Sequence, residues 1–193
     1  MRILLIFTSL LFLSFSFTST GEPLQSKGNY VDWTEGKLNW KQFKGKVPSG
    51  TPFAALTYSA IDLQLESEGN SLSIFINTIF DPKLSWKKKD VNDYLLAHEQ
   101  LHFDITEYHS RLLRKELQSI KFKSFDSIGD QVQEVFMKIS QDADDMQEEY
   151  DSDTDHSKVK RKQLEWNDKV KSLLKETKDY ADKRIQLDIS YLN

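Results

Sequence analysis

The stretch from Leu95 to Glu107 reads LLAHEQLHFDITE and decides how the chain folds. Its apolar residues recur on nearly every side of the helix that the pattern predicts: Leu95, Leu96, Ala97, Leu101, Phe103 and Ile105. A helix that is apolar all round is buried in a protein core. His98, Glu99 and His102 therefore enter the interior with this helix, where they need partners because an unpaired buried polar group costs free energy.

Helices dominate the chain from this stretch onward. The pattern extends the first helix over residues 91–117, with Asp90 as its N-cap. Apolar residues at helical spacing predict two further helices, over residues 128–149 and 159–181. The polar residues 151–156, which read DSDTDH, are expected to form a loop between them. Such lengths favour an antiparallel bundle of about three long helices.

Strands precede the helices. Polar and apolar residues alternate over residues 53–66 and again over 71–80, and SEGN at 67–70 is a turn signal. The two strands should form an antiparallel hairpin. We therefore expect an α+β fold, with a small antiparallel sheet on the N-terminal side followed by the helical bundle. The strand at 71–80 is a candidate edge along which an extended peptide would lie.

The first twenty residues have the pattern of a secretory signal peptide. A basic Arg2 is followed by an apolar run and then by small and hydroxyl-bearing residues. The apolar run is shorter than the ~18 residues that a membrane span usually needs. We expect a signal peptide over residues 1–20, a tether over 21–35 and one domain over 36–193. The protein is then secreted or periplasmic, without stable membrane insertion after signal cleavage.

The composition limits the kinds of functional site that the chain can form. The formal net charge of −4 gives no electrostatic reason to expect binding to nucleic acid. The chain contains no cysteine, so a thiolate metal site and a cysteine nucleophile are both excluded. Any metal ion must be held by histidine, aspartate or glutamate.

The helix at residues 91–117 carries the spacing His98-Glu99-x-x-His102. Residues four apart lie on one helix face, so both imidazoles can reach one ion. Glu99 lies about 100° around the helix from His98, where its carboxylate can approach a water molecule without becoming a ligand. This arrangement is typical of metal-assisted hydrolysis and predicts one zinc ion held by His98 and His102.

A catalytic zinc ion usually takes a third protein ligand. His109 lies about 10.5 Å further along the helix axis than His102, and Glu107 and Asp104 point to other faces. An antiparallel second helix returns residues near 147–156 to the level of the two histidines, which favours His156 as the third ligand. The competing oxygen ligands are Asp151, Asp153 and Asp155.

Several segments resemble a bacterial family known as domain of unknown function 922. They are LNWKQFKG at 38–45, AALT at 54–57, SW at 85–86, LLAHEQLHFDITE at 95–107 and YDSDTDH at 150–156, followed by Gln163 and Trp166. That family is described as predicted secreted zinc-dependent proteases. The resemblance implies His98 and His102 as ligands, Glu99 as the catalytic carboxylate, and the YDSDTDH segment as the source of the third ligand. Ser157 stands where the family pattern has glycine.

These observations predict a zinc metallopeptidase of the HExxH type with a zincin-like active-site helix. Glu99 would act as the general base on a water molecule, and Tyr150 would donate a hydrogen bond to the oxyanion. The expected partner is a peptide or protein substrate. Three alternatives stay open: an amidase that cuts cell-wall peptides with the same site, a secreted binding module with a structural zinc ion, and a metal-free helical adaptor.

Overall fold

The computed structural model describes residues 13–15 and 30–192, and its main sheet is built around one long hairpin. Strands β4 (Ser59–Glu68) and β5 (Ser71–Phe80) pair antiparallel along their whole length. Gly69 lies in the turn with a φ of +56°, a conformation that glycine adopts without steric cost. The α+β fold class and the hairpin that the alternating pattern predicts are therefore confirmed.

Strand β5 lies inside the sheet rather than at its edge. On the side away from β4 it pairs with β7 (Arg184–Asp188) at one end and with β2 (Val31–Asp32) at the other. The expectation that residues 71–80 offer a free edge to a peptide is therefore wrong. The strand that covers most of this edge comes from the C-terminal end of the chain, where the sequence pattern did not indicate it.

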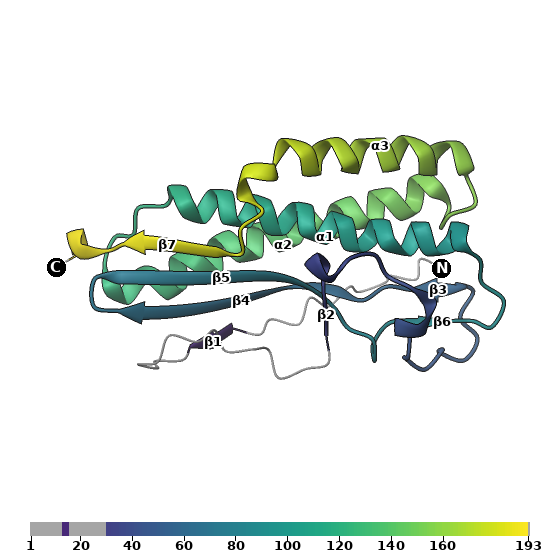
Figure 1. Cartoon of the computed structure of the whole chain (residues 1–193), viewed down its shortest axis with the longest axis horizontal. Helices are drawn as coiled ribbons and strands as arrows, with labels where there is room; N and C mark the ends of the chain where they lie inside the picture. Colours follow the sequence, from purple (N-terminus) through teal and green to yellow (C-terminus); the bar gives the residue numbers. More distant parts are fainter. Residues whose placement is uncertain (1–12, 16–29, 193) are drawn as a thin grey trace.

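A second, two-stranded sheet lies below the N-terminal end of α1 (Figure 1). It consists of β3 (Ala55–Leu56) and β6 (Trp86–Lys87). The first predicted strand is thus divided, because the backbone N–H of Tyr58 bonds to Ser85 Oγ at 2.9 Å instead of continuing the ladder. Gly45 packs so closely here that a Cβ atom would meet the Ser85 carbonyl oxygen at 2.8 Å.

Helices α1 (Asp93–Ser119) and α2 (Ile128–Thr154) cover one face of the main sheet (Figure 1). Helix α3 (Lys160–Glu176) packs on these two helices, on their side away from the sheet. The three long helices of the prediction are thus present. Asn92 caps α1 by accepting the Leu95 N–H at 2.9 Å, so the helix begins two residues later than a cap at Asp90 predicts.

The C-terminal end of α2 differs from the prediction in a way that matters for the site. The helix continues past Glu149 to Thr154, whose hydroxyl donates to the Tyr150 carbonyl at 2.7 Å. It ends at Asp155, which has a left-handed backbone and an N–H directed at the carbonyl of Asp151. Most of the predicted loop at 151–156 is therefore helical. Asp151 consequently projects from the last turns of a helix.

Two clusters of buried apolar residues hold these layers together. The larger lies between the main sheet and the helices that cover it, and it includes Leu63, Ile74, Ile76, Leu113, Leu117, Val132, Phe136 and Ile139. The smaller lies among the three helices and consists of Leu101, Ile105, Tyr150, Trp166 and Val170. The second cluster joins residues of all three helices and adjoins the buried histidines, because its Tyr150 ring stacks on the His98 ring.

A buried ionic network holds the middle of α1. Glu107 accepts hydrogen bonds from Arg111 Nε at 2.8 Å, Arg114 Nη1 at 3.1 Å and Thr78 Oγ1 at 2.6 Å. Arg114 also donates to the Ile76 carbonyl of β5 at 2.8 Å. Buried charges are tolerated when they are paired in this way. Glu107 therefore serves the fold and points away from the histidines, as the helix geometry predicts.

The N-terminal segment contributes short pieces. Strand β1 (Leu13–Phe15) pairs in parallel with β4 and falls within the expected signal peptide. The rest of that segment and most of the expected tether lie outside the described residues. The end of the tether contacts the domain, because Trp33 Nε1 donates to Asp104 Oδ1 at 2.8 Å. Within residues 13–15 and 30–192, no helix combines the length and the apolar character needed to span a membrane.

Candidate metal centre

His98 and His102 lie one turn apart on the buried face of α1. Their side chains are almost completely shielded from solvent, and their ring centroids are 4.9 Å apart. The two Nε2 atoms approach to 3.3 Å. The four-residue spacing on a helix has therefore brought the two imidazoles together in the way that the sequence predicts.

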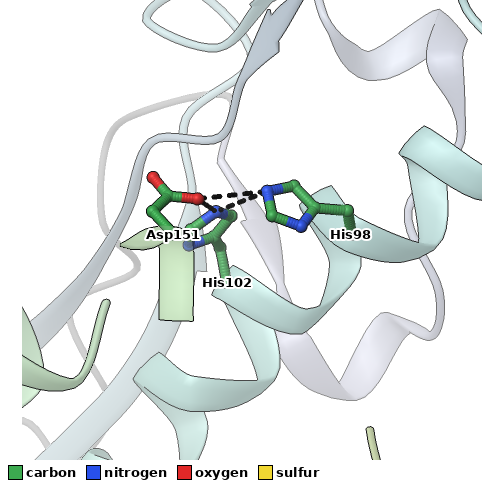
Figure 2. A group of neighbouring side chains, drawn as sticks. All are labelled: His98, His102 and Asp151. Carbon is green, nitrogen blue, oxygen red and sulfur yellow. Dashed lines mark hydrogen bonds and ion pairs between the residues drawn. The ribbon is translucent and has the colours of Figure 1, made fainter. Parts of the chain in front are cut away.

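Asp151 completes a group of three potential ligands. Its Oδ1 atom lies 3.2 Å from Nε2 of His98 and 3.2 Å from Nε2 of His102 (Figure 2). Among the described residues, this is the group of His, Asp and Glu side chains whose ligand atoms all lie within 4.8 Å of one another. The antiparallel return of α2 beside α1 places Asp151 at this level.

The spacing of the three atoms fits a tetrahedral metal ion. Ligand atoms about 2.0–2.1 Å from a tetrahedral zinc ion are separated by roughly 3.3–3.4 Å. The observed separations are 3.2, 3.2 and 3.3 Å. Two imidazole nitrogens and one carboxylate oxygen are also a donor set that zinc accepts. These residues therefore fit a zinc ion in both chemistry and distance.

The outer nitrogens of both rings are held by glutamine side chains. His98 Nδ1 lies 2.9 Å from Gln163 Oε1, and His102 Nδ1 bonds to Gln147 Oε1. The Gln147 amide nitrogen donates to the His102 carbonyl at 2.9 Å, which fixes its oxygen toward the ring. Because an amide oxygen only accepts, each Nδ1 carries a proton, and the Nε2 atom of each ring is the one that can bind a metal ion when the ring is neutral.

The buried carboxylate of Asp151 needs one positive charge beside it. Burial alone would lower the pKa of His102, but the nearby Asp151 carboxylate raises that pKa to about 9. Burial would likewise raise the pKa of Asp151, yet the two histidines hold it well below its usual range. A proton on His102 or a metal ion among the three groups supplies the charge that balances the carboxylate.

Glu99 lies next to the group without belonging to it. Its side chain is 3% exposed, and its Oε2 atom accepts the hydroxyl of Thr57 at 2.7 Å. Thr57 follows β3, so the small sheet fixes this carboxylate from the side opposite α1. Burial raises the pKa of Glu99 even though the two histidines act to lower it. A raised pKa makes this buried carboxylate a better proton acceptor than an exposed glutamate.

A cavity of about 660 Å³ opens above these groups. His98, Glu99, His102 and Asp151 all border it. Its walls come from β3 and the residues before it, from the start of α1, from the turn after α2 and from the first residue of α3: Phe53, Ala55, Leu56, Val91, Tyr94, Leu95, His156 and Lys160. Small-molecule and substrate pockets are commonly ~300–1,000 Å³ in volume. The cavity is thus large enough to admit part of a peptide.

Tyr150 lies behind the histidines and does not border the cavity. Its side chain is 0% exposed, and its ring stacks on the His98 ring with centroids 4.6 Å apart. Its hydroxyl donates to Gln163 Oε1 at 2.8 Å. Burial raises the pKa of this hydroxyl, so it stays protonated. This position does not suit the oxyanion donor expected from the sequence, because the hydroxyl is directed at Gln163 and away from the cavity.

The structure brings Asp151, and not His156, to the two histidines. His156 Nδ1 lies 3.4 Å from Oδ2 of Asp151, on the far side of that carboxylate. The reason is the extra length of α2, which directs Asp151 inward from the helix and leaves His156 in the turn beyond. Of the remaining candidates, Asp153 accepts from Trp166 Nε1 at 3.0 Å, and Asp155 pairs with Lys158 at 3.2 Å.

Three supporting residues were not identified as part of the site from the sequence. Gln147 lies one turn before Asp151 on the same face of α2, so helix spacing could have indicated it. Gln163 and Thr57 appeared only as pieces of the resemblance to the bacterial family. Their contacts depend on α3 and on the small sheet, whose positions the sequence pattern does not give.

The fold and the site together define an α+β protein with a buried His-His-Asp group suited to a metal ion. The chain belongs to the DUF922 family, whose description is "Bacterial protein of unknown function", and the family model matches residues 16–157. The match includes both histidines, Glu99 and Asp151. Searches among curated proteins and among solved structures returned no match.

Proposed function

We propose that this protein is a secreted zinc-dependent metallopeptidase in which Glu99 is the general base. One observation carries the proposal: the lone-pair atoms of His98, His102 and Asp151 converge beside Glu99 at the floor of an open cavity. This combines a metal-binding donor set with a buried carboxylate that can move a proton. Peptide hydrolysis needs both at one place.

The four residues divide between two tasks in this proposal. His98, His102 and Asp151 would hold the zinc ion. A zinc ion there would polarise a carbonyl group and lower the pKa of a water molecule toward ~7. Glu99, held by Thr57, would accept the proton of the attacking water and pass it to the leaving amine. Burial of Glu99 supports this task because it favours the protonated form between the two transfers.

The surroundings of the site favour a catalytic over a structural metal ion. A structural zinc ion is usually enclosed by four protein ligands, whereas a catalytic one keeps a position open. In the described part of the chain the group supplies three ligand atoms and borders a cavity of about 660 Å³. A substrate could therefore reach the position that the protein leaves open.

In the part of the chain that the structure describes, β3 pairs with β6 on one side, and its other side is the proposed binding edge for an extended peptide. The Lys88 N–H donates to the Ala54 carbonyl at 2.7 Å across the β3–β6 pair. Because alternate residues of an antiparallel strand bond to the same neighbour, the N–H and C=O of Ala55 point away from β6. Ala55 also borders the cavity. A peptide that adds as a further strand at Ala55 would pass over the buried histidines.

The proposal is tested by zinc content and by hydrolysis, measured on the same preparations. The wild-type protein should bind one zinc equivalent and cleave casein, with loss of activity in a chelator and recovery with zinc. Glu99→Gln should keep the zinc and lose hydrolysis. Asp151→Ala should lose both zinc and hydrolysis. Peptidoglycan fragments form a second substrate arm, which separates a general peptidase from an amidase of cell-wall peptides.

Two results would overturn the mechanism. Full hydrolytic activity in Glu99→Gln would exclude Glu99 as the base. A wild-type protein that holds zinc, melts at a lower temperature in chelator and cleaves neither substrate would indicate a structural metal ion.

Export is proposed from residues 1–20 alone, and N-terminal sequencing of the protein recovered from its native compartment would test it.

A further inference from the structure

Three successive residues after α2 have left-handed backbones. The φ angles of Asp155, His156 and Ser157 are 45°, 50° and 73°. Residues other than glycine rarely adopt this region, and a run of three needs support from the surrounding structure. Strain of this kind concentrates at functional sites. The turn lies at the rim of the cavity, directly after the helix that carries Asp151.

The support for this turn comes from both sides of His156. Its backbone N–H donates to the carbonyl of Asp151 at 3.0 Å, and the Val159 N–H donates to the Thr154 carbonyl at 2.8 Å. On the other side the ring of Phe53 packs edge-on against the imidazole, with centroids 4.7 Å apart. The imidazole is therefore held between the β3 segment and the end of α2.

The two oxygens of Asp151 face different partners as a result. Oδ1 lies 3.2 Å from the Nε2 atom of each buried histidine, whereas Oδ2 lies 3.4 Å from Nδ1 of His156. A carboxylate that had Oδ2 free could rotate about its Cβ–Cγ bond or offer both oxygens to one ion. The contact with His156 opposes both changes.

We infer that His156 is a positioning residue that holds Oδ2 of Asp151, so that Oδ1 remains directed at the metal position. The inference rests on the metal site of the proposed function and assigns His156 a task other than ligation. Partners of metal-ligating groups typically change metal affinity by about 10–100-fold when they are removed. His156 should have an effect of this size without being bound to the ion.

A pair of substitutions separates the side chain from the backbone. His156→Gly and His156→Asn both suit the left-handed conformation, so neither adds strain to the turn. Asparagine keeps a polar amide near the position of Nδ1, whereas glycine removes the side chain. Zinc affinity is measured by competition with a chromophoric chelator, and the melting temperature of each metal-free protein reports its folding. His156→Gly should bind zinc about 10–100-fold more weakly than wild type, and His156→Asn should recover most of the loss.

The other outcomes overturn either the positioning role of His156 or the proposed function. Equal affinity in His156→Gly and wild type would mean that Asp151 needs no such support. An equal loss in both variants, together with a cobalt absorption spectrum that has lost one nitrogen ligand, would make His156 a ligand. A wild-type protein without zinc affinity would overturn the proposed function as well. Failure of hydrolysis with normal zinc affinity would overturn the peptidase proposal and leave the positioning role standing.

Discussion

The side-chain amide of Gln147 bonds to His102 twice. Its oxygen accepts the Nδ1 proton of the ring, and its nitrogen donates to the His102 backbone carbonyl at 2.9 Å. One residue of α2 thus fixes both the tautomer and the orientation of a ring on α1. Gln147→Met, which keeps the size and removes the amide, should weaken zinc binding about 10–100-fold in chelator competition.

The matched control for this prediction is Gln147→Glu. A carboxylate still accepts the Nδ1 proton but cannot donate to the His102 carbonyl, so zinc affinity should fall less than in Gln147→Met. Unchanged affinity in Gln147→Met, with a normal melting temperature, would show that the ring is fixed by packing alone.

The hydroxyl of Tyr150 should contribute little to hydrolysis. It donates to Gln163 behind the histidines, so Tyr150→Phe should keep kcat and lower stability by about 1 kcal/mol for the lost hydrogen bond. Removal of a true oxyanion donor costs about 10²–10³ in kcat. Kinetics on zinc-loaded protein distinguish the two cases, and a loss of that size in Tyr150→Phe would return the residue to the catalytic role expected from the sequence.

The proposed peptide edge at Ala55 can be blocked without disturbing the β3–β6 pair. Ala55→Pro removes an N–H that points away from β6, so one backbone hydrogen bond to the substrate is lost. A hydrogen bond worth about 1 kcal/mol corresponds to roughly a five- to tenfold loss in kcat/KM. Ala55→Val keeps the N–H and controls for side-chain size. Equal kinetics for the proline and valine variants would argue against binding along this edge.

Ser157→Gly should stabilise the protein. The serine has a φ of +73°, which costs a residue with a Cβ atom about 1–2 kcal/mol, while glycine loses about 0.5–1 kcal/mol more backbone entropy on folding. The expected net gain is about 0.5–1 kcal/mol, or a rise of about 1–4 °C in the melting temperature. Ser152→Gly is the control, because the same exchange inside α2 should destabilise by about 0.5–1 kcal/mol. A fall in melting temperature for Ser157→Gly would contradict the strain argument.

We expect Asp144 on α2 to make the stability of the protein depend on pH. Burial, with help from Asp145 and Glu148, raises the pKa of Asp144 to about 6. The pKa of this carboxyl group is higher in the folded than in the unfolded protein. The folded protein therefore loses stability as the pH rises from 3.8 to about 6, and the loss persists at higher pH. Asp144→Asn should therefore be more stable than wild type at pH 7.5, by ~1 kcal/mol or less because the group is partly exposed.

The advantage of Asp144→Asn should shrink as the pH falls through about 6 and vanish below about 4. Urea unfolding of both proteins at pH 7.5 and pH 4 measures it. A difference that is the same at both values would trace the effect to packing instead of ionisation.

Local sequence patterns were enough to predict much of the fold and the part of the site that lies on α1. The alternation over residues 71–80 gave β5 with its observed bounds, because period two is a property of the strand itself. The pairing of β5 on both sides was not predictable, since β7 joins it from more than a hundred residues away. The edge predicted at residues 71–80 was wrong for this reason.

His98, Glu99 and His102 were set by the sequence alone, because helix geometry places residues four apart on one face whatever surrounds them. The third partner of the histidines was decided by tertiary structure. The lengths of the two helices predicted that residues near 147–156 lie beside the histidines. The choice between Asp151 and His156 depended on whether α2 continued for one more turn. That turn is stabilised by the Thr154 hydroxyl and by contacts with α3, and such cooperative, long-range packing leaves no periodic trace in the sequence.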